Sequence, residues 1–308
     1  MRLLLRLAAL GALALVLAPA SASAAPRMLV GFQDDMSFRI RPDRQLVLDR
    51  AQEANATIIR ATVNWWDVAR TRPKDATDPF DPAYNFRDID ELARGAQIRG
   101  IELLLTIWGT PGWANGGKGR NHMPKSLSDL SQFAYALALR YSGRYPGYPF
   151  VRYYSIWNEP NLEQFLAPQF DKKGHDIAPA LYAHLCRASY GPIKAGNPLA
   201  LVAIGETSAR GRDVLNKGTT QETHSPGKFA ELVSKQRPKV QFDAWAHHPY
   251  PTSPGLKPTA KVRWPNVSLG MLPRLETALD RWFGRRRVPV WITEYGHETK
   301  PQDRRGVT

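Results

Sequence analysis

The sequence predicts an α/β fold, a TIM (β/α)8 barrel that lacks its last strand and helix in this chain. Strand-like and helix-like segments alternate along the chain, which is typical of parallel strands joined by crossover helices. Polar and aromatic residues follow several strands, whereas an open doubly wound sheet would gather them at one crevice. The first strand-like run is followed by no Gly-rich phosphate turn, and the length suits one barrel of about 250 residues.

The expected strands are short apolar runs, several of them apolar on both faces, as buried parallel strands are. They span 28–32, 57–63, 101–107, 151–157, 199–204, 242–246 and 288–293. The expected helices span 42–54, 86–99, 128–141, 177–190, 226–236 and 269–283. Gly100 and Gly284 follow two of them as terminators, and Ser126 or Ser128 is the expected N-cap of the third. A closed barrel needs about eight strands, so we expect a C-terminally incomplete barrel; an open barrel would expose two strand edges.

The first residues have the pattern of a targeting segment. Arg2 and Arg6 precede an apolar stretch over 7–17 and a small-residue run over 20–25, which is typical of a secretory signal peptide. We expect cleavage after Ala24, hence a signal over 1–24, one barrel domain over 25–308 and a secreted, extracellular protein. The apolar stretch is too short for a membrane span.

The chain is strongly basic, with a formal net charge of +14. Such a charge favours anionic partners, and an anionic cell-surface polymer is one hypothesis. The basic residues are scattered, with one tight run at 285–287, and no nucleic-acid motif accompanies them, so no nucleic-acid partner is expected. Cys186 is the only cysteine; we expect a small buried apolar residue and no intrachain disulfide.

Two glutamates stand at the ends of expected strands. Glu159 lies in the phrase Trp-Asn-Glu-Pro at 157–160, and Glu294 lies in Trp-Ile-Thr-Glu-Tyr-Gly at 291–296. Alternate residues of 288–294 are apolar until Glu294, which predicts that Glu294 continues an inward-facing row, and 151–159 repeats this less cleanly. The carboxyl ends of barrel strands meet at one face, so the two should lie together. Asn158 and Glu159 would face opposite ways on a regular strand, which predicts an irregular backbone there.

Other polar and aromatic residues cluster at the ends of further expected strands: Arg60 and Trp66 at the second, Trp108 and Trp113 at the third, and His247, His248 and Tyr250 at the sixth. Because side chains alternate between the two faces of a strand, Trp245 and Trp291 are expected on the helix-facing side, packed in the core.

Over about residues 29–294 the chain resembles the clan A glycoside hydrolases, retaining (β/α)8 barrels of the family 5 cellulase-like and family 39 β-xylosidase-like kinds. The resemblance implies that Glu159 is the acid/base and Glu294 the nucleophile. It further implies substrate-site roles for Asn158 at the sugar 2-hydroxyl, Arg60 and Tyr250 at the nucleophile, and His248, with His247 competing, at the sugar or the acid/base. The clan's eighth-strand tryptophan has no counterpart here.

The implied activity is hydrolysis of β-linked O-glycosidic bonds in oligo- or polysaccharides, in carbohydrate metabolism, by a double displacement. Glu159 would start protonated and Glu294 ionised, and no cofactor or metal would be needed. Trp66, Trp108 and Trp113 are expected sugar platforms, because rings pack well on the apolar faces of sugars.

Two rival interpretations stay open. A metal-dependent barrel hydrolase could use His247, His248, His297 and the two glutamates, although adjacent histidines on a strand face opposite ways. A non-catalytic carbohydrate-binding surface protein could retain the barrel, because a fold does not determine a function.

Overall fold

The structure is a computed structural model that describes residues 28–215, 221–253 and 255–297. Two compact units divide the chain, Met1–Val30 and Gly31–Thr308, and the second holds the elements described below. The expected signal peptide, 1–24, lies outside the described residues. Within the described part of the chain, no helix has both the length and the apolar character needed to cross a membrane.

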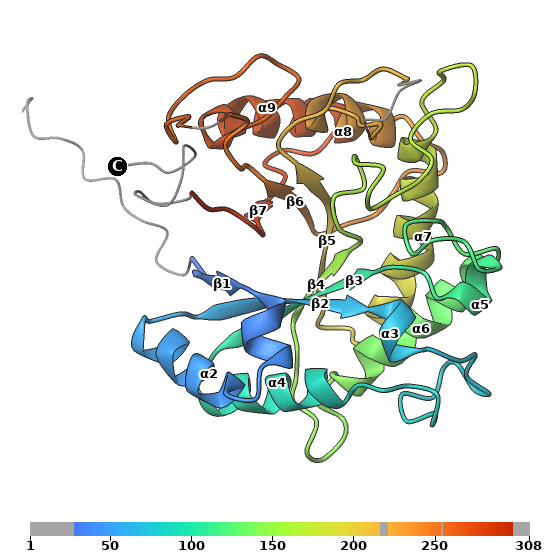
Figure 1. Cartoon of the computed structure of the whole chain (residues 1–308), viewed down its shortest axis with the longest axis vertical. Helices are drawn as coiled ribbons and strands as arrows, with labels where there is room; N and C mark the ends of the chain where they lie inside the picture. The colour runs from blue at the N-terminus through green and yellow to red at the C-terminus, as the bar shows by residue number, and fades with distance from the viewer. Residues whose placement is uncertain (1–27, 216–220, 254, 298–308) are drawn as a thin grey trace, which may run out of the picture. The chain divides into compact units, whose positions relative to one another are not determined.

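A seven-stranded parallel sheet forms the centre of the Gly31–Thr308 unit, with the strands side by side in chain order (Figure 1). The strands are β1 (Gly31–Gln33), β2 (Ile58–Asn64), β3 (Glu102–Trp108), β4 (Tyr153–Ile156), β5 (Leu201–Ser208), β6 (Ala244–His248) and β7 (Val290–Ile292). Consecutive parallel neighbours are the strand arrangement of a (β/α) barrel. The sheet runs from β1 to β7 as its two edges, so the described residues form a barrel-like fold without the final unit, as predicted.

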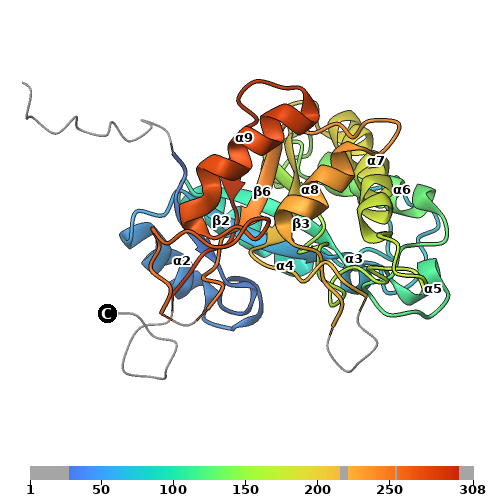
Figure 2. The ribbon, with the colours of Figure 1, turned by 90° about the horizontal axis from the view of Figure 1, so that it is seen from above.

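The helices lie around the outer side of the sheet (Figures 1 and 2). The longer ones are α2 (Arg44–Glu53), α4 (Arg87–Ile98), α6 (Leu127–Arg140), α7 (Ala178–Gly196), α8 (Pro226–Ser234) and α9 (Leu272–Phe283). Each predicted helix is found within a few residues of its expected bounds, except that α7 is six residues longer at its C-terminus. Short pieces that were not predicted are the π-helix η1 (Met36–Ile40), α3 (Trp65–Val68) and α5 (Gly112–Asn115), and the 3-10 turn η2 (Leu269–Met271) precedes α9.

The main core lies between the sheet and these helices. Trp65, Phe133, Phe229 and Trp245 are among its fully buried aromatic side chains. The buried residues of α4, such as Ile89 and Leu92, recur at helical spacing and face the sheet, as an amphipathic covering helix requires. Burial of these large apolar side chains removes them from water, which fixes the helix positions and thereby the strand ends.

The inner side of the sheet is lined differently, by small and polar side chains. Ala203, Ala244 and Ala246 form a small separate cluster against which Trp291 packs. Deeper polar residues pair with each other, as in the 2.7 Å hydrogen bond between the hydroxyls of Thr106 and Ser155 (part of the inward row of β3 and β4).

The predicted facing of β7 is wrong. Trp291 pairs with Ala246 and contacts the ring of Tyr153 on the inner side, whereas Val290 packs against the outer core. The row 288–292 therefore faces outward, and the expected helix-facing position of Trp291 is also wrong. Trp245 does face the helices, with its ring 5.7 Å from that of Phe283 on α9. The register with β6 decides the facing, and it places Trp291 beside the inward Ala246 and Val290 beside the outward Trp245.

Candidate active site

Arg60 on β2 organises the charged groups at the carboxyl ends of the strands. It pairs in register with Leu104 on the inward row and is only 4% exposed. Its guanidinium donates to Glu294 Oε1 at 2.6 Å, to Glu206 Oε2 at 2.9 Å and to Asn158 Oδ1 at 2.8 Å. One buried cation thus joins a group within β5 and two groups that follow β4 and β7.

The end of β4 is irregular, which confirms the prediction made from Asn158 and Glu159. Regular pairing stops at Ile156, and Trp157 and Glu159 have positive φ angles of 69° and 36°. Residues other than glycine adopt this region at a cost of about 1–3 kcal/mol each, and such strained residues are enriched at active sites. The backbone turn allows both Asn158 and Glu159 to reach the inner side, where a regular strand would separate them.

Glu206 belongs to the same cluster and was missed by the sequence interpretation. A bulge in β5 between Ile204 and Thr207 adds one residue, with φ angles of 104° at Gly205 and 46° at Glu206. Strict alternation would put Glu206 on the helix-facing side of the sheet, the side of Ile204. A bulge shifts the alternation of side chains, so Glu206 points inward instead. The residues Gly-Glu-Thr directly after the expected strand 199–204 were the available signal, since glycine marks bulges in strands.

The two histidines of β6 face opposite sides. His248 points inward, with Nδ1 3.1 Å from Glu159 Oε1 and Nε2 2.8 Å from Glu206 Oε2. His247 points outward and bonds the Thr207 hydroxyl at 2.9 Å and the Val267 carbonyl at 2.9 Å. The structure therefore places His248, and not its competitor, with the predicted site residues.

Glu294 lies two residues beyond the end of β7. There the chain has left the strand, so Thr293 and Glu294 both reach the cluster. The Thr293 hydroxyl donates to Glu206 Oε2 at 3.0 Å, and the Tyr250 hydroxyl donates to Glu294 Oε2 at 3.1 Å. Glu294 thus accepts from Arg60 with one oxygen and from Tyr250 with the other.

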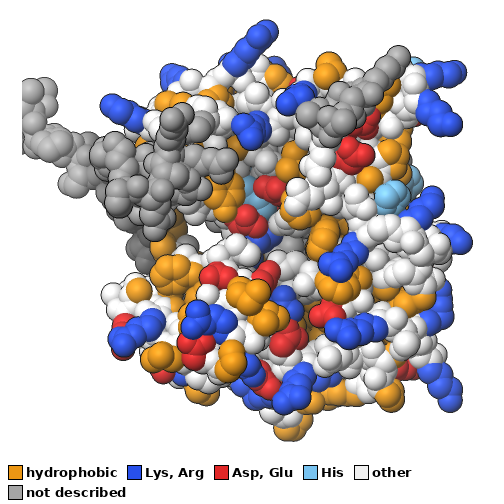
Figure 3. Space-filling model, in the orientation of Figure 1, with side chains coloured by type: hydrophobic (Ala, Val, Ile, Leu, Met, Phe, Trp, Pro, Cys, Tyr) orange, Lys and Arg blue, Asp and Glu red, His pale blue; other side chains and the backbone are white. Residues whose placement is uncertain are grey.

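Burial divides the three carboxylates into two kinds. The side chains of Glu159 and Glu294 are 14% and 16% exposed, whereas those of Glu206 and His248 are 0% exposed. A molecule in the site can touch Glu159 and Glu294, but Glu206 is covered. Figure 3 shows a hollow in the middle of this face in which acidic side chains and a histidine are visible.

Charge pairing sets the protonation of the buried groups. Burial alone would raise the pKa of Glu206, but the charge of Arg60 and the hydrogen bond from His248 lower it to about 2. Burial alone would lower the pKa of His248, but its bonds to Glu159 and Glu206 raise it to about 9. Burial lowers the pKa of His247 to about 4, so adjacent histidines differ in charge at neutral pH.

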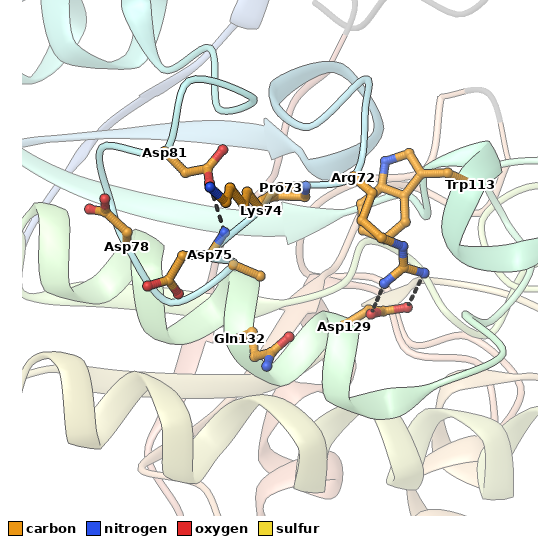
Figure 4. Close-up of a pocket in the computed structure, with 10 residues that line it drawn as sticks. Arg72, Pro73, Lys74, Asp75, Asp78, Asp81, Trp113, Asp129 and Gln132 are labelled. Atoms are coloured by element: carbon orange, nitrogen blue, oxygen red, sulfur yellow. Dashed lines mark hydrogen bonds and ion pairs between the residues drawn. The ribbon is translucent and has the colours of Figure 1, made fainter.

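Each tryptophan predicted as a sugar platform also contacts another part of the chain. Trp66 is covered by the Arg120 guanidinium, 3.4 Å from its ring, and Trp108 donates its indole N–H to the Phe165 carbonyl at 3.4 Å. Trp113 donates to the Ala69 carbonyl at 2.7 Å and lines a separate pocket of about 680 Å³. Figure 4 shows this pocket, in which Arg72 lies against Trp113 and pairs with an aspartate of α6.

No group of three or more His, Cys, Asp and Glu side chains is arranged to hold a metal ion within the described ranges. In the cluster, the Arg60 guanidinium occupies the position between Glu206 and Glu294. The charge that balances these carboxylates is therefore supplied by the chain itself.

The structure of this chain is similar to solved structures, although its sequence matches no protein-family model and no curated protein sequence. A glucosidase from Croceicoccus marinus is 16% identical at a TM-score of 0.61, over 90% of this chain and 53% of the other. A β-xylosidase from Caulobacter crescentus is 21% identical at a TM-score of 0.57, over 90% and 53%.

An endo-1,4-β-mannanase from Rhizomucor miehei is 14% identical at a TM-score of 0.53, over 88% of this chain and 78% of the other. The chain spans about half the length of the first two proteins. At these identities the likeness shows the fold: the described residues have the TIM-barrel-like fold of solved glycoside hydrolases.

Proposed function

We propose that the protein is an O-glycosyl hydrolase that cleaves β-linked carbohydrates by a retaining double displacement, with Glu159 as acid/base and Glu294 as nucleophile. The observation that carries the proposal is the pair of partly exposed carboxylates at the ends of β4 and β7, held by Arg60, His248 and Tyr250. The shared fold with solved glycosidases supports it.

The spacing of the two carboxylates supports the retaining mechanism. His248 Nδ1 lies 3.1 Å from Glu159 Oε1 and 3.7 Å from Glu294 Oε2, so these two oxygens are at most 6.8 Å apart, the sum of the two distances. Retaining enzymes place the two groups about 5–5.5 Å apart, and inverting enzymes about 6.5–9.5 Å apart. The upper limit for these two oxygens is compatible with the retaining spacing and lies at the low end of the inverting range.

Each carboxylate has surroundings that suit its step. In the first step, Glu294 forms a bond to the anomeric carbon, the bond to the leaving oxygen breaks, and the proton of Glu159 goes to that oxygen. In the second, water attacks the anomeric carbon, Glu159 takes the water proton, and Glu294 leaves as a carboxylate. Arg60 and Tyr250 hold the two oxygens of Glu294, which orients it for attack.

The first experiment measures hydrolysis of aryl β-glycosides, β-glucans, xylan and mannan by the chain and by Glu294→Gln and Glu159→Gln. Glu276→Gln on the exposed face of α9 is the matched control. We expect turnover that both site variants lose by at least about a thousandfold and that the control keeps, with retained anomeric configuration by proton NMR. Inversion would refute the mechanism, equal turnover by Glu294→Gln would refute the nucleophile, and binding without turnover would favour a carbohydrate-binding protein.

Secretion and an anionic cell-surface polymer as a second partner remain proposals from the sequence. Export from the host followed by N-terminal sequencing tests the first, with a mature start at Ala25 expected. Retention of the exported protein on cell-wall material, lost steeply with added salt, tests the second.

A further inference from the structure

We propose that Glu206 is a positioning residue of the catalytic centre: its buried carboxylate holds His248 with Nε2–H directed at Glu206 and Nδ1 directed at Glu159, so that Glu159 and His248 share one catalytic proton. The orientation of His248 stands on the contacts alone. Its catalytic consequence rests on the proposed function.

A single oxygen of Glu206 is the convergence point of the cluster. Oε2 accepts from His248 Nε2 at 2.8 Å, from Arg60 at 2.9 Å and from the Thr293 hydroxyl at 3.0 Å. These donors come from β6, β2 and the segment after β7. Glu206 also ties down the acid/base directly, since the Glu159 backbone N–H donates to the Glu206 carbonyl at 2.9 Å.

The β5 backbone is shaped to bring this carboxylate inward. Gly205 has a φ of 104°, and a Cβ there would meet the Ala246 carbonyl oxygen at 2.6 Å and the Trp245 ring at 2.6 Å. Its N–H donates to the Tyr182 hydroxyl at 2.7 Å, and that hydroxyl donates to the Ile156 carbonyl at 2.8 Å. The bulge is therefore anchored to β4 through α7, which supports the strained φ of Glu206.

Glu206 is ionised at neutral pH and can only accept hydrogen bonds. The His248 nitrogen that faces it must then carry a hydrogen in both charge states of the ring. Nδ1, facing Glu159, is the nitrogen that gains or loses the proton. With the imidazolium, Nδ1–H donates to an ionised Glu159; with the neutral ring, Nδ1 accepts from a protonated Glu159, the form needed to protonate a leaving oxygen.

Several charges face His248, and Glu206 is distinguished among them by burial. The ring is faced by Glu159 after β4, Glu206 on β5 and Glu294 after β7. Arg60 donates to the same Glu206 oxygen as His248. His247 on β6 and Tyr250 in the loop after β6 are the other titratable neighbours of His248. Because the Glu206 side chain is 0% exposed, solvent does not screen its negative charge. This charge can keep the shared proton on the Glu159–His248 pair while substrate occupies the outer carboxylates.

The first test uses the parent chain and needs no activity. Nitrogen-15 NMR of histidine-labelled protein, with the His248 signal assigned by its loss in His248→Gln, reports which nitrogen keeps its hydrogen above the titration. We expect the Nε2–H tautomer. The Nδ1–H tautomer would overturn the proposal, whether or not the protein hydrolyses glycosides.

The second test compares Glu206→Gln with Thr293→Val, which touches the same oxygen but leaves the charge. The pKa of His248, followed by NMR, should fall by about one unit or more in Glu206→Gln, because an opposite charge within about 4–6 Å is lost. It should not fall in Thr293→Val. An unchanged pKa of His248 in Glu206→Gln, or an equal fall of this pKa in both variants, would refute the positioning role of Glu206. If Glu206→Gln fails to fold, the tautomer in the parent decides.

The third test is the pH profile of kcat/KM. The shared proton would be lost at lower pH in Glu206→Gln, so the alkaline limb should move down by about one unit, a tenfold loss on that side, with a smaller loss below the optimum. A loss that is equal at every pH indicates a structural role only and overturns the inference. Activity of the parent that Glu294→Gln abolishes shows separately that the proposed function holds.

Discussion

Replacement of Arg60 by methionine should destabilise the protein strongly and in a pH-dependent way. Methionine keeps most of the unbranched apolar stem of the side chain but removes the cation that pairs with Glu206 and Glu294 at 2.9 Å and 2.6 Å. Removing one partner of a buried ion pair costs about 3–5 kcal/mol, because the remaining charge is left uncompensated. In a domain of this size that corresponds to roughly 10 °C in Tm.

The sign of the pH dependence follows from Glu206. Its pKa in the folded chain is lowered from 4.5 to about 2, with burial opposing and Arg60 chiefly responsible for the fall. The stability that this ionisation contributes is present above about pH 4.5 and is lost as the pH falls through about 2. The difference in Tm between the parent and Arg60→Met should therefore be largest near about pH 7 and shrink near about pH 3.

The assay is thermal unfolding followed by circular dichroism at both pH values. Arg72→Met is the matched control, since Arg72 pairs with Asp129 at 2.7 Å but is 58% exposed, and such surface pairs contribute about 0–1 kcal/mol. A Tm loss for Arg60→Met as small as that of the control, or one that grows in acid, would refute the reasoning that a buried cation balances these carboxylates.

Three further outcomes are expected. Tyr250→Phe removes one donor to Glu294 and should lower kcat/KM by about 10- to 100-fold, as loss of a hydrogen bond to a charged group does, with Tm nearly unchanged. Cys186 should not react with a thiol reagent until the protein unfolds, because burial raises its pKa to about 12; rapid reaction of the native chain would contradict its placement. Gly205→Ala, whose methyl group would meet the Trp245 ring at 2.6 Å, should lower Tm and activity together, and unchanged values of both would show that the β5 bulge is not needed.

The sequence was sufficient to predict the elements whose patterns are local. Alternating apolar strands and amphipathic helices gave the order of the sheet, and the phrase around Asn158 and Glu159 predicted the irregular end of β4, because two neighbouring polar residues cannot share one face of a regular strand. The alternation of side chains along a strand favours His248 over His247 as the inward residue, because His248 shares a face with Tyr250. In these cases a stretch of only a few neighbouring residues determines the predicted feature.

Features that depend on how strands pair could not be predicted in the same way. The inward facing of Glu206 depends on one extra residue in the β5 ladder, and parity counted along the sequence gives the opposite face. The facing of Trp291 was wrong for a related reason, since register with β6 decides it. Trp66, one of the expected sugar platforms, lies under Arg120, and no local pattern indicates this contact between segments distant in sequence.

The sharing of Arg60 between two carboxylates has a consequence for the electrical balance of the proposed reaction. When Glu294 forms an ester with the sugar, it loses its negative charge, and a guanidinium paired with Glu294 alone would become an unneutralised cation in a nearly dry interior. Glu206 is fully buried and its pKa is lowered to about 2, so it stays ionised while Glu294 reacts in the proposed double displacement. It is therefore a permanent counter-ion for Arg60, and the covalent intermediate forms without the electrostatic penalty that would otherwise be added to its barrier.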